Sequence, residues 1–257
     1  MTPRRIANAV RAGALIRIRR DRYASANLDA HVREAVRIGG RLSCLSVLQQ
    51  LGVFVHRSRG LHVHIVRGGS RLRTPRARST TLHWHPAIEQ AELLHVASLI
   101  DVVRHAVRCQ EPRAALATLD SLLFLGLMTR EDLIEVFDTV PRRFRSLLAL
   151  ADGSAESGPE TFVRLILRTL GVPFETQVRI PGVGRVDFMV DGWLIIECDS
   201  RAFHAGWEQQ VADRRRDLAA ARLGYTTVRP LAADIMDHPD RLRLALIDIF
   251  DARAAVR

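Results

Sequence analysis

Two short apolar segments separated by a tight turn carry carboxylates, and this pattern constrains the fold more than any other in the chain. The first segment is Gly184–Val190, which contains Asp187, and the second is Trp193–Asp199, which contains Glu197. An Asp-Gly pair between them is a strong turn signal, so the two segments are expected to form a hairpin. Carboxylates on apolar strands are costly to bury unless they are protonated, paired or bound to a cation. A divalent-metal site is therefore the leading hypothesis.

The length of the turn decides which carboxylates share a face. Glu197 and Asp199 are two residues apart on one strand, so both face the same side. A two-residue loop, Asp191-Gly192, places Asp187 on the opposite face, whereas a three-residue loop, Val190-Asp191-Gly192, places it with the other two. We therefore predict an odd loop or a β-bulge at this turn.

The rest of the C-terminal part predicts helices and strands in the order α-β-β-β-α-β-α. A stretch of small and polar residues, 151–159, marks the boundary before it. The expected elements, from their hydrophobic patterns and flanking glycines, are a helix at Ser157–Leu170, strands at Glu175–Ile180, Gly184–Val190 and Trp193–Asp199, a helix at Trp207–Leu223, a strand at Tyr225–Arg229 and a helix at Asp240–Ala252.

This order of elements, with Asp187 on the second strand and Glu197-Cys198-Asp199 on the third, resembles the PD-(D/E)xK nuclease fold. Within that fold it is most similar to the group related to very-short-patch-repair endonucleases, over roughly residues 154–250. The resemblance implies a restriction-endonuclease-like domain with a mixed sheet that hydrolyses phosphodiester bonds in DNA with Mg²⁺ or Mn²⁺. It also implies that Asp187, Glu197 and the backbone carbonyl of Cys198 bind the metal, while Asp199 or His204 assists the attacking water.

Two further residues have competing interpretations. Ser157-x-x-Glu160 is a capping box, which needs no catalytic role, yet Glu160 also lies on the helix stripe that should face the sheet. Arg216 belongs to a charged run on a helix, which is usually a solvated face, but the resemblance implies that it faces the site and contacts a phosphate. Both are kept as candidate site residues.

The chain contains no lysine, although the PD-(D/E)xK motif takes its name from one. Asp199 stands at that position, and the repair-endonuclease group uses histidine, so His204 is the natural substitute. The missing lysine keeps open a second interpretation. In it, the protein is a catalytically inactive DNA-binding regulator or an antitoxin-like protein that retains the nuclease fold as a scaffold.

The positive charge of the chain lies in its N-terminal third. The net charge is +10, yet residues 1–80 alone hold 17 arginines against three acidic residues. Clustered guanidinium groups suit phosphate contacts, so we expect DNA, double- or single-stranded, as the partner. The candidate contact residues are Arg17, Arg19, Arg20, Arg22 and Arg41.

Residues 1–87 have the pattern of a winged helix-turn-helix. A helix near residues 4–12 and a basic hairpin precede helices at Leu28–Ile38 and Ser43–Leu51, and strands follow at Leu61–Val66 and Thr80–Trp84. The arrangement from residue 4 to residue 66 resembles the N-terminal region of the abortive-infection antitoxin family, which implies winged-helix DNA binding. The predicted fold class is α+β, with a winged-helix-like region at 1–87, a helical connector at 88–152 and a nuclease-like domain at 153–257.

The cysteines and histidines carry weaker signals. Cys44, Cys109 and Cys198 form no CxxC pair, so they are interpreted as reduced thiols of a cytoplasmic protein. His62-x-His64 and His83-x-His85 each place two imidazoles on one face of a strand, an arrangement that suits a transition-metal site. With no cysteine or acid at helpful spacing nearby, the favoured interpretation is that these histidines are only polar. No apolar run approaches the length of a membrane span, so no membrane partner is expected.

A third interpretation is a protein-interaction module in a phage-defence or toxin–antitoxin system, which binds its partner through residues 88–150. Salt dependence separates this interpretation from DNA binding, because binding through many phosphate contacts weakens steeply as salt rises.

Overall fold

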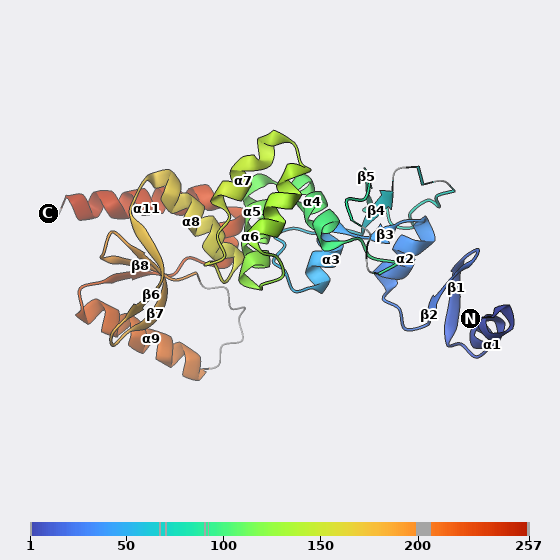
Figure 1. The fold of residues 1–257 in the computed structure, drawn as a ribbon. Coiled ribbons are helices and arrows are strands. Elements are labelled where there is room, and N and C mark those ends of the chain that lie inside the picture. The colour runs from blue at the N-terminus through green and yellow to red at the C-terminus, as the bar shows by residue number, and fades with distance from the viewer. Residues whose placement is uncertain are drawn as a thin grey trace. The chain divides into compact units, whose positions relative to one another are not determined.

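The chain folds into two units, each described by itself (Figure 1). Unit 1 comprises residues 1–115 and 128–150, and unit 2 comprises residues 116–127 and 151–257. The structure, a computed structural model, describes all residues except Met1, Arg67, Ser70, Gln90, Glu92, 199–206, 256–257 and the side chains of Glu208 and Gln209. In the part of the chain that it describes, no helix is both long and apolar enough to span a bilayer.

Unit 1 begins with a helix and a hairpin. Helix α1 (Pro3–Arg11) has a proline in its first turn, which suits helix entry, and is followed by strands β1 (Leu15–Arg19) and β2 (Arg22–Ser25). The two strands pair antiparallel, with a register shift between Arg17 and Arg19. The helix and basic hairpin expected from the sequence are confirmed.

A second sheet of unit 1 has the order β3-β4-β5. Helix α2 (Ala30–Ile38) precedes this sheet. Asp29 caps its start by accepting hydrogen bonds from two backbone N–H groups, and Gly39, at φ 114°, ends it. Strands β3 and β4 pair antiparallel, whereas β4 and β5 pair parallel. The elements of this part are α2 (Ala30–Ile38), β3 (Arg41–Leu42), α3 (Cys44–Gln50), β4 (His62–Val66) and β5 (Thr81–His85).

The parallel pairing of β4 and β5 differs from the hairpin of a wing. A wing is an antiparallel hairpin joined by a short turn, whereas residues 67–80 separate these two parallel strands. The α+β class is confirmed, but the winged-helix arrangement stays a prediction that β4 and β5 do not support. Sequence patterns identify strands and not their partners, which explains the difference.

Helices complete unit 1. Helix α4 (Leu99–Cys109) packs on α3 and on α6 (Arg130–Asp138). Thr129 caps α6 in a reciprocal capping box with Asp132. A 3₁₀ turn (Arg142–Phe144) and α7 (Arg145–Leu150) follow, while α5 (Pro112–Phe124) begins in unit 1 and continues into unit 2. The region expected to be helical is helical, but it is not a separate connector, because its residues belong to both units.

Unit 2 contains one mixed four-stranded sheet in the order β6-β7-β8-β9. The β8–β9 pair is parallel and the other pairs are antiparallel. The order of helices and strands expected from the sequence is confirmed, with one additional short helix, α10. The elements are α8 (Gly158–Leu170), β6 (Phe174–Ile180), β7 (Gly184–Val190), β8 (Leu194–Ile196), α9 (Trp207–Arg222), β9 (Thr226–Val228), α10 (Ala232–Asp237) and α11 (Pro239–Ala254).

Helices cover this sheet on both sides. Figure 1 shows α9 on one side and α8 with α11 on the other. Ala220 of α9 packs in one apolar cluster with Met189 of β7 and Ile195 of β8, so α9 covers the face that carries these two residues. The functional carboxylates expected from the sequence lie on the same two strands.

A buried ion pair joins the two chain segments of unit 2. The side chains of Asp120 on α5 and Arg164 on α8 form a salt bridge and are each only 1% exposed. The hydroxyl of Thr161 donates to Asp120 over 2.7 Å, and Asp152 lies 3.0 Å from the Arg164 guanidinium. The unit therefore includes residues before 153, where the sequence placed its start.

Candidate functional site

The turn between β7 and β8 places Asp187 and Glu197 on the same face of the sheet. Val190 pairs with Leu194, which leaves a three-residue loop at residues 191–193. The last observed pair is Phe188 with Ile196, and one further pair in the same register sets Asp187 opposite Glu197. The predicted odd loop is confirmed, although it is one residue further along the chain than expected. Gly192 has a left-handed φ of 70°, which glycine adopts without strain.

Asp187 lies half-buried beside the end of the neighbouring strand. Its Oδ2 accepts a hydrogen bond from the backbone N–H of Cys198 over 2.7 Å. Burial raises the pKa of the Asp187 carboxyl, and that hydrogen bond offsets part of the rise. Burial also raises the pKa of the Cys198 thiol, with a further rise from the charges of Asp187 and Glu160. Three acidic groups are thus close enough to influence one another here.

Glu197 forms an ion pair with Arg216 of α9. The guanidinium Nη2 lies 2.8 Å from Oε1 of Glu197, and the same group donates to the backbone carbonyl of Arg185 over 2.7 Å. Arg229 lies 3.7 Å from the same carboxylate oxygen. Burial nevertheless raises the pKa of Glu197, against the lowering effect of both arginines. Arg216 therefore lies against the carboxylates and is not on a purely solvated helix face.

Glu160 is buried at the first turn of α8 and is held by three donors. Its carboxylate accepts from the Ser157 hydroxyl over 2.7 Å, from the backbone N–H of Glu156 over 2.9 Å and from the Gln177 amide over 3.0 Å. Burial raises the pKa of Glu160, and the negative charge of Asp187 raises it further. Both interpretations of Glu160 therefore have a physical basis, as a cap of α8 and as a neighbour of Asp187.

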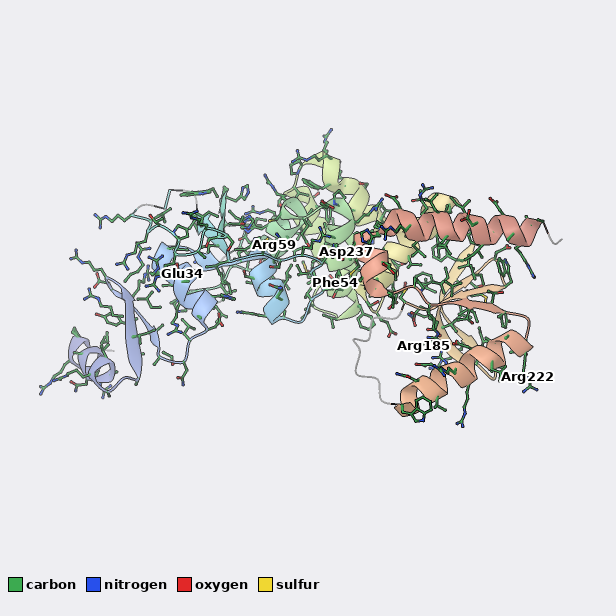
Figure 2. The ribbon with its side chains drawn as sticks, turned by 180° about the vertical axis from the view of Figure 1, so that it is seen from behind. Glu34, Phe54, Arg59, Arg185, Arg222 and Asp237 are labelled. Atoms are coloured by element: carbon green, nitrogen blue, oxygen red, sulfur yellow. The ribbon has the colours of Figure 1, made fainter. Side chains whose placement is uncertain are left out.

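Two of the predicted catalytic residues, Asp199 and His204, lie outside the described residues. The carboxylates that the structure places near one another are those of Asp187, Glu197 and Glu160. Figure 2 labels Arg185, on the strand that carries Asp187. Its guanidinium pairs with Glu156 at 2.6 Å, which places one more charged pair beside this group.

Arginines line a hollow of about 770 Å³ in unit 1. Glu34, labelled in Figure 2, accepts two hydrogen bonds of 2.7 Å from Arg37 and lies 3.9 Å from Arg76. A single acid therefore offsets only part of the local positive charge. The arginines along the hollow are Arg17, Arg33, Arg37, Arg73 and Arg76.

The arginines expected to contact DNA lie on or near the first hairpin and the second sheet. Arg17 and Arg19 belong to β1, Arg22 begins β2 and Arg41 belongs to β3. Arg20, in the hairpin turn, is 87% exposed. Arg19 donates to the backbone carbonyl of Arg71 over 2.7 Å, while Arg17 lines the hollow.

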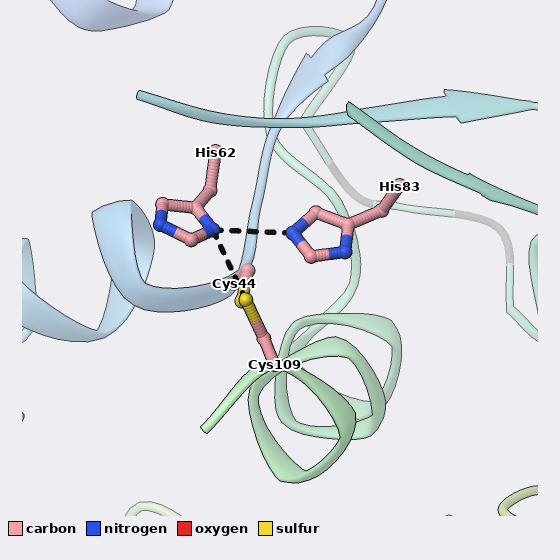
Figure 3. Close-up of side chains that lie close together, drawn as sticks. All are labelled: Cys44, His62, His83 and Cys109. Atoms are coloured by element: carbon pink, nitrogen blue, oxygen red, sulfur yellow. Dashed lines mark hydrogen bonds between the residues drawn. The ribbon is translucent and has the colours of Figure 1, made fainter. Parts of the chain in front are cut away.

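The structure corrects the interpretation of the cysteines and histidines of unit 1. Cys44, His62, His83 and Cys109 each offer one ligand atom, and all four atoms lie within 4.8 Å of one another (Figure 3). Among the described residues, this is the one group of three or more such side chains. The sequence places His62 and His83 in two separate HxH pairs but does not indicate that they meet each other and the two cysteines, because the four residues belong to four different elements and no two are close in sequence.

Two of these four side chains influence each other's protonation. Burial raises the pKa of the Cys44 thiol, while the hydrogen bond from that thiol lowers the pKa of Cys109 to about 3. Burial and neighbouring histidines also keep the pKa of His105, which stacks on His83, well below its ordinary value. The imidazole of His105 is therefore neutral near pH 7.

These observations define a two-unit α+β protein with a carboxylate group in unit 2 and a Cys/His group in unit 1. The chain is 32% identical over 273 aligned positions to two proteins of Mycobacterium tuberculosis, "Uncharacterized protein MT2308" of strain CDC 1551 / Oshkosh and "Uncharacterized protein Rv2248" of strain ATCC 25618 / H37Rv. The match covers 94% of this chain and 94% of each relative, so the chain belongs to the same family as these mycobacterial proteins. No family model and no solved structure matches the chain.

Proposed function

We propose that the protein is a metal-dependent DNA endonuclease with a PD-(D/E)xK-type domain in unit 2. The observation that carries this proposal is the register of β7 and β8, which sets Asp187 opposite Glu197 on a partly buried sheet face. Burial raises the pKa of both carboxyls, and at Glu197 it does so despite the opposing effect of Arg216 and Arg229, so the two negative charges are costly there. A divalent ion would offset that cost.

The free oxygen atoms of the two carboxylates fit a hard cation. Among contacts from the described residues, Asp187 accepts a hydrogen bond only at Oδ2 and Glu197 is paired only at Oε1, which leaves one oxygen on each. Mg²⁺ and Mn²⁺ prefer such oxygen ligands, and the backbone carbonyl of Cys198 is the proposed third. When bound, the ion would activate a water and offset charge on the phosphate.

The remaining roles belong to neighbouring side chains. Arg216 holds Glu197 in place through Nη2, and we propose that it also binds a phosphate oxygen of the substrate. Asp199 or His204 is proposed to accept a proton from the attacking water, in place of the missing lysine. DNA is proposed to dock on the arginines of residues 1–80, in a winged-helix-like mode of phosphate contact.

Cleavage of labelled single- and double-stranded DNA with Mg²⁺, Mn²⁺ or EDTA tests the proposal. Asp187→Asn removes one negative charge without changing the side-chain size, so cleavage should fall to background while DNA affinity stays within about twofold. The matched control is Asp191→Asn in the adjacent loop, where φ is 48° and asparagine is well tolerated. Equal cleavage by the Asp187 variant would refute the assignment.

A second candidate function is supported by a specific observation. Every carboxylate of the group already has a protein donor: Asp187 has the Cys198 amide, Glu197 has Arg216, and Glu160 has three donors. Such a site can persist without a metal, as in an inactive regulator or antitoxin-like protein that binds DNA through its arginines. DNA binding with no cleavage of any substrate would favour this candidate.

A further inference from the structure

The Cys/His group of unit 1 has the composition of a transition-metal site. Cys44 begins α3, His62 begins β4, His83 lies on β5 and Cys109 ends α4. In Figure 3 the side chains point toward one another from these four elements. Thiolate and imidazole are the ligands that proteins use for Zn²⁺, and a set of two of each is a common tetrahedral combination.

Two distances between ligand atoms match the edges of a zinc tetrahedron. With Zn–N near 2.0–2.1 Å and Zn–S near 2.3 Å, tetrahedral geometry requires about 3.3 Å between two nitrogens and about 3.6 Å between nitrogen and sulfur. Nδ1 of His62 lies 3.2 Å from Nε2 of His83 and 3.7 Å from Sγ of Cys109. Both pairs are therefore already spaced for a shared ion.

Two independent features show that the site is built and held in place. Cys44 has a φ of 52°, in the left-handed region that non-glycine residues rarely adopt, and this backbone carries its sulfur into the group. Behind His83, the His105 ring stacks at 4.7 Å and is fixed by a 2.9 Å hydrogen bond to the Ser43 hydroxyl. Second-layer contacts of this kind orient metal ligands.

We propose that Cys44, His62, His83 and Cys109 bind one Zn²⁺ ion in a four-coordinate structural site. Two thiolates balance the charge of the ion, which suits a site in which Cys44 and His62 are buried. Both cysteines bind as thiolates, and each proton that their thiols carry before binding is released to water. Cys109 is exposed, so the ion can enter from that side.

The ion would connect four segments that are far apart in the sequence. Leu61 and Thr80, which line the arginine hollow, directly precede the two strands that carry the histidines. Zinc would therefore hold one rim of the hollow in place. This inference does not depend on nuclease activity, because the site and the carboxylate group lie in different units.

Metal analysis of the full chain, purified under reducing conditions without chelators, tests the proposal. We expect about one zinc ion per chain by mass spectrometry. Replacement of zinc by Co²⁺ should give a thiolate-to-cobalt charge-transfer band and intense visible bands typical of four-coordinate cobalt. Cys109→Ser is the primary variant, because an exposed side chain can be changed with little effect on packing. It should lose the charge-transfer intensity of one thiolate and most of the bound metal.

Two control variants keep the test decisive. Cys198→Ser changes the third thiol, which lies in unit 2, and should retain the zinc. Cys109→His restores a ligand at the same position and should recover binding with a weaker charge-transfer band. Absence of zinc and of a cobalt spectrum in the wild-type protein would overturn the proposal. Zinc retained in full by Cys109→Ser, or a Cys44–Cys109 disulfide in the purified protein, would overturn it as well.

Discussion

Glu160 shows how a single buried carboxylate links stability to function. It caps α8, yet its charge is held near that of Asp187, and burial raises its pKa above the ordinary value of 4.5. At a pH between the pKa of Glu160 in the unfolded chain and its higher pKa in the folded protein, the folded protein binds more protons than the unfolded chain. The free energy of unfolding therefore falls as the pH rises through this window. Above it, the full cost of the buried charge is present.

Glu160→Gln should remove this cost. The glutamine oxygen can accept from the Glu156 amide and from Gln177, and its NH₂ group can donate to the Ser157 hydroxyl. We expect the variant to be more stable than the wild type in metal-free buffer at pH 8 and to approach it at low pH, where Glu160 is protonated. Urea unfolding at several pH values measures this. A variant that is less stable at pH 8 would contradict the predicted pKa direction.

At the scale of elements, the β7–β8 hairpin was predictable and the Cys/His group was not. The Asp-Gly pair predicts a turn, and the alternation of side chains along each strand predicts an odd loop if Asp187 and Glu197 share a face. The three-residue loop agrees with this. The Cys/His group depends on the parallel pairing of β4 with β5, which sets His64 beside His83 and brings His62 within reach of it. No local pattern specifies such a pairing, because both strands and the two cysteines are separated by long segments.

Gly192 tests how much the hairpin depends on its loop. A Cβ at this position would meet no atom within 4 Å, so Gly192→Ala introduces no clash, only backbone strain at a φ of 70°. We expect unit 2 to lose about 1 kcal/mol of unfolding free energy. Chemical denaturation measures the loss, with Asp191→Asn as the control that should change little. If the proposed function holds, cleavage should persist, because the register of β7 and β8 is unchanged and Asp187 and Glu197 stay on the same face.

Across the full chain, the uneven charge distribution predicts that DNA binding depends strongly on salt concentration. Residues 1–80 carry 17 of the 38 basic residues and three acids, and five arginines line one hollow. The concentration of charge was evident from the sequence. The hollow was not, because it is formed by segments from β1 to the start of β5 that only the tertiary fold brings together.

Binding of the full chain to DNA should weaken steeply between roughly 50 and 200 mM salt. Arg17→Gln and Arg33→Gln, both at the hollow, should each reduce the slope of log affinity against log salt by about one. Arg243→Gln on α11 of unit 2 is the matched control and should leave the slope unchanged. Fluorescence anisotropy over a salt series provides the measurement. A flat response in the wild type would instead indicate a protein partner.

The ion pair of Asp120 and Arg164 also limits how early unit 2 can finish folding during synthesis. The two residues are 44 positions apart, so at 5–20 residues per second Asp120 leaves the ribosome about 2–9 s before Arg164. Residues 128–150, which belong to unit 1, are synthesised in that interval. Neither unit can therefore finish folding before synthesis of the other has begun. A gene divided at residue 151 would place Asp120 on one polypeptide and Arg164 on the other.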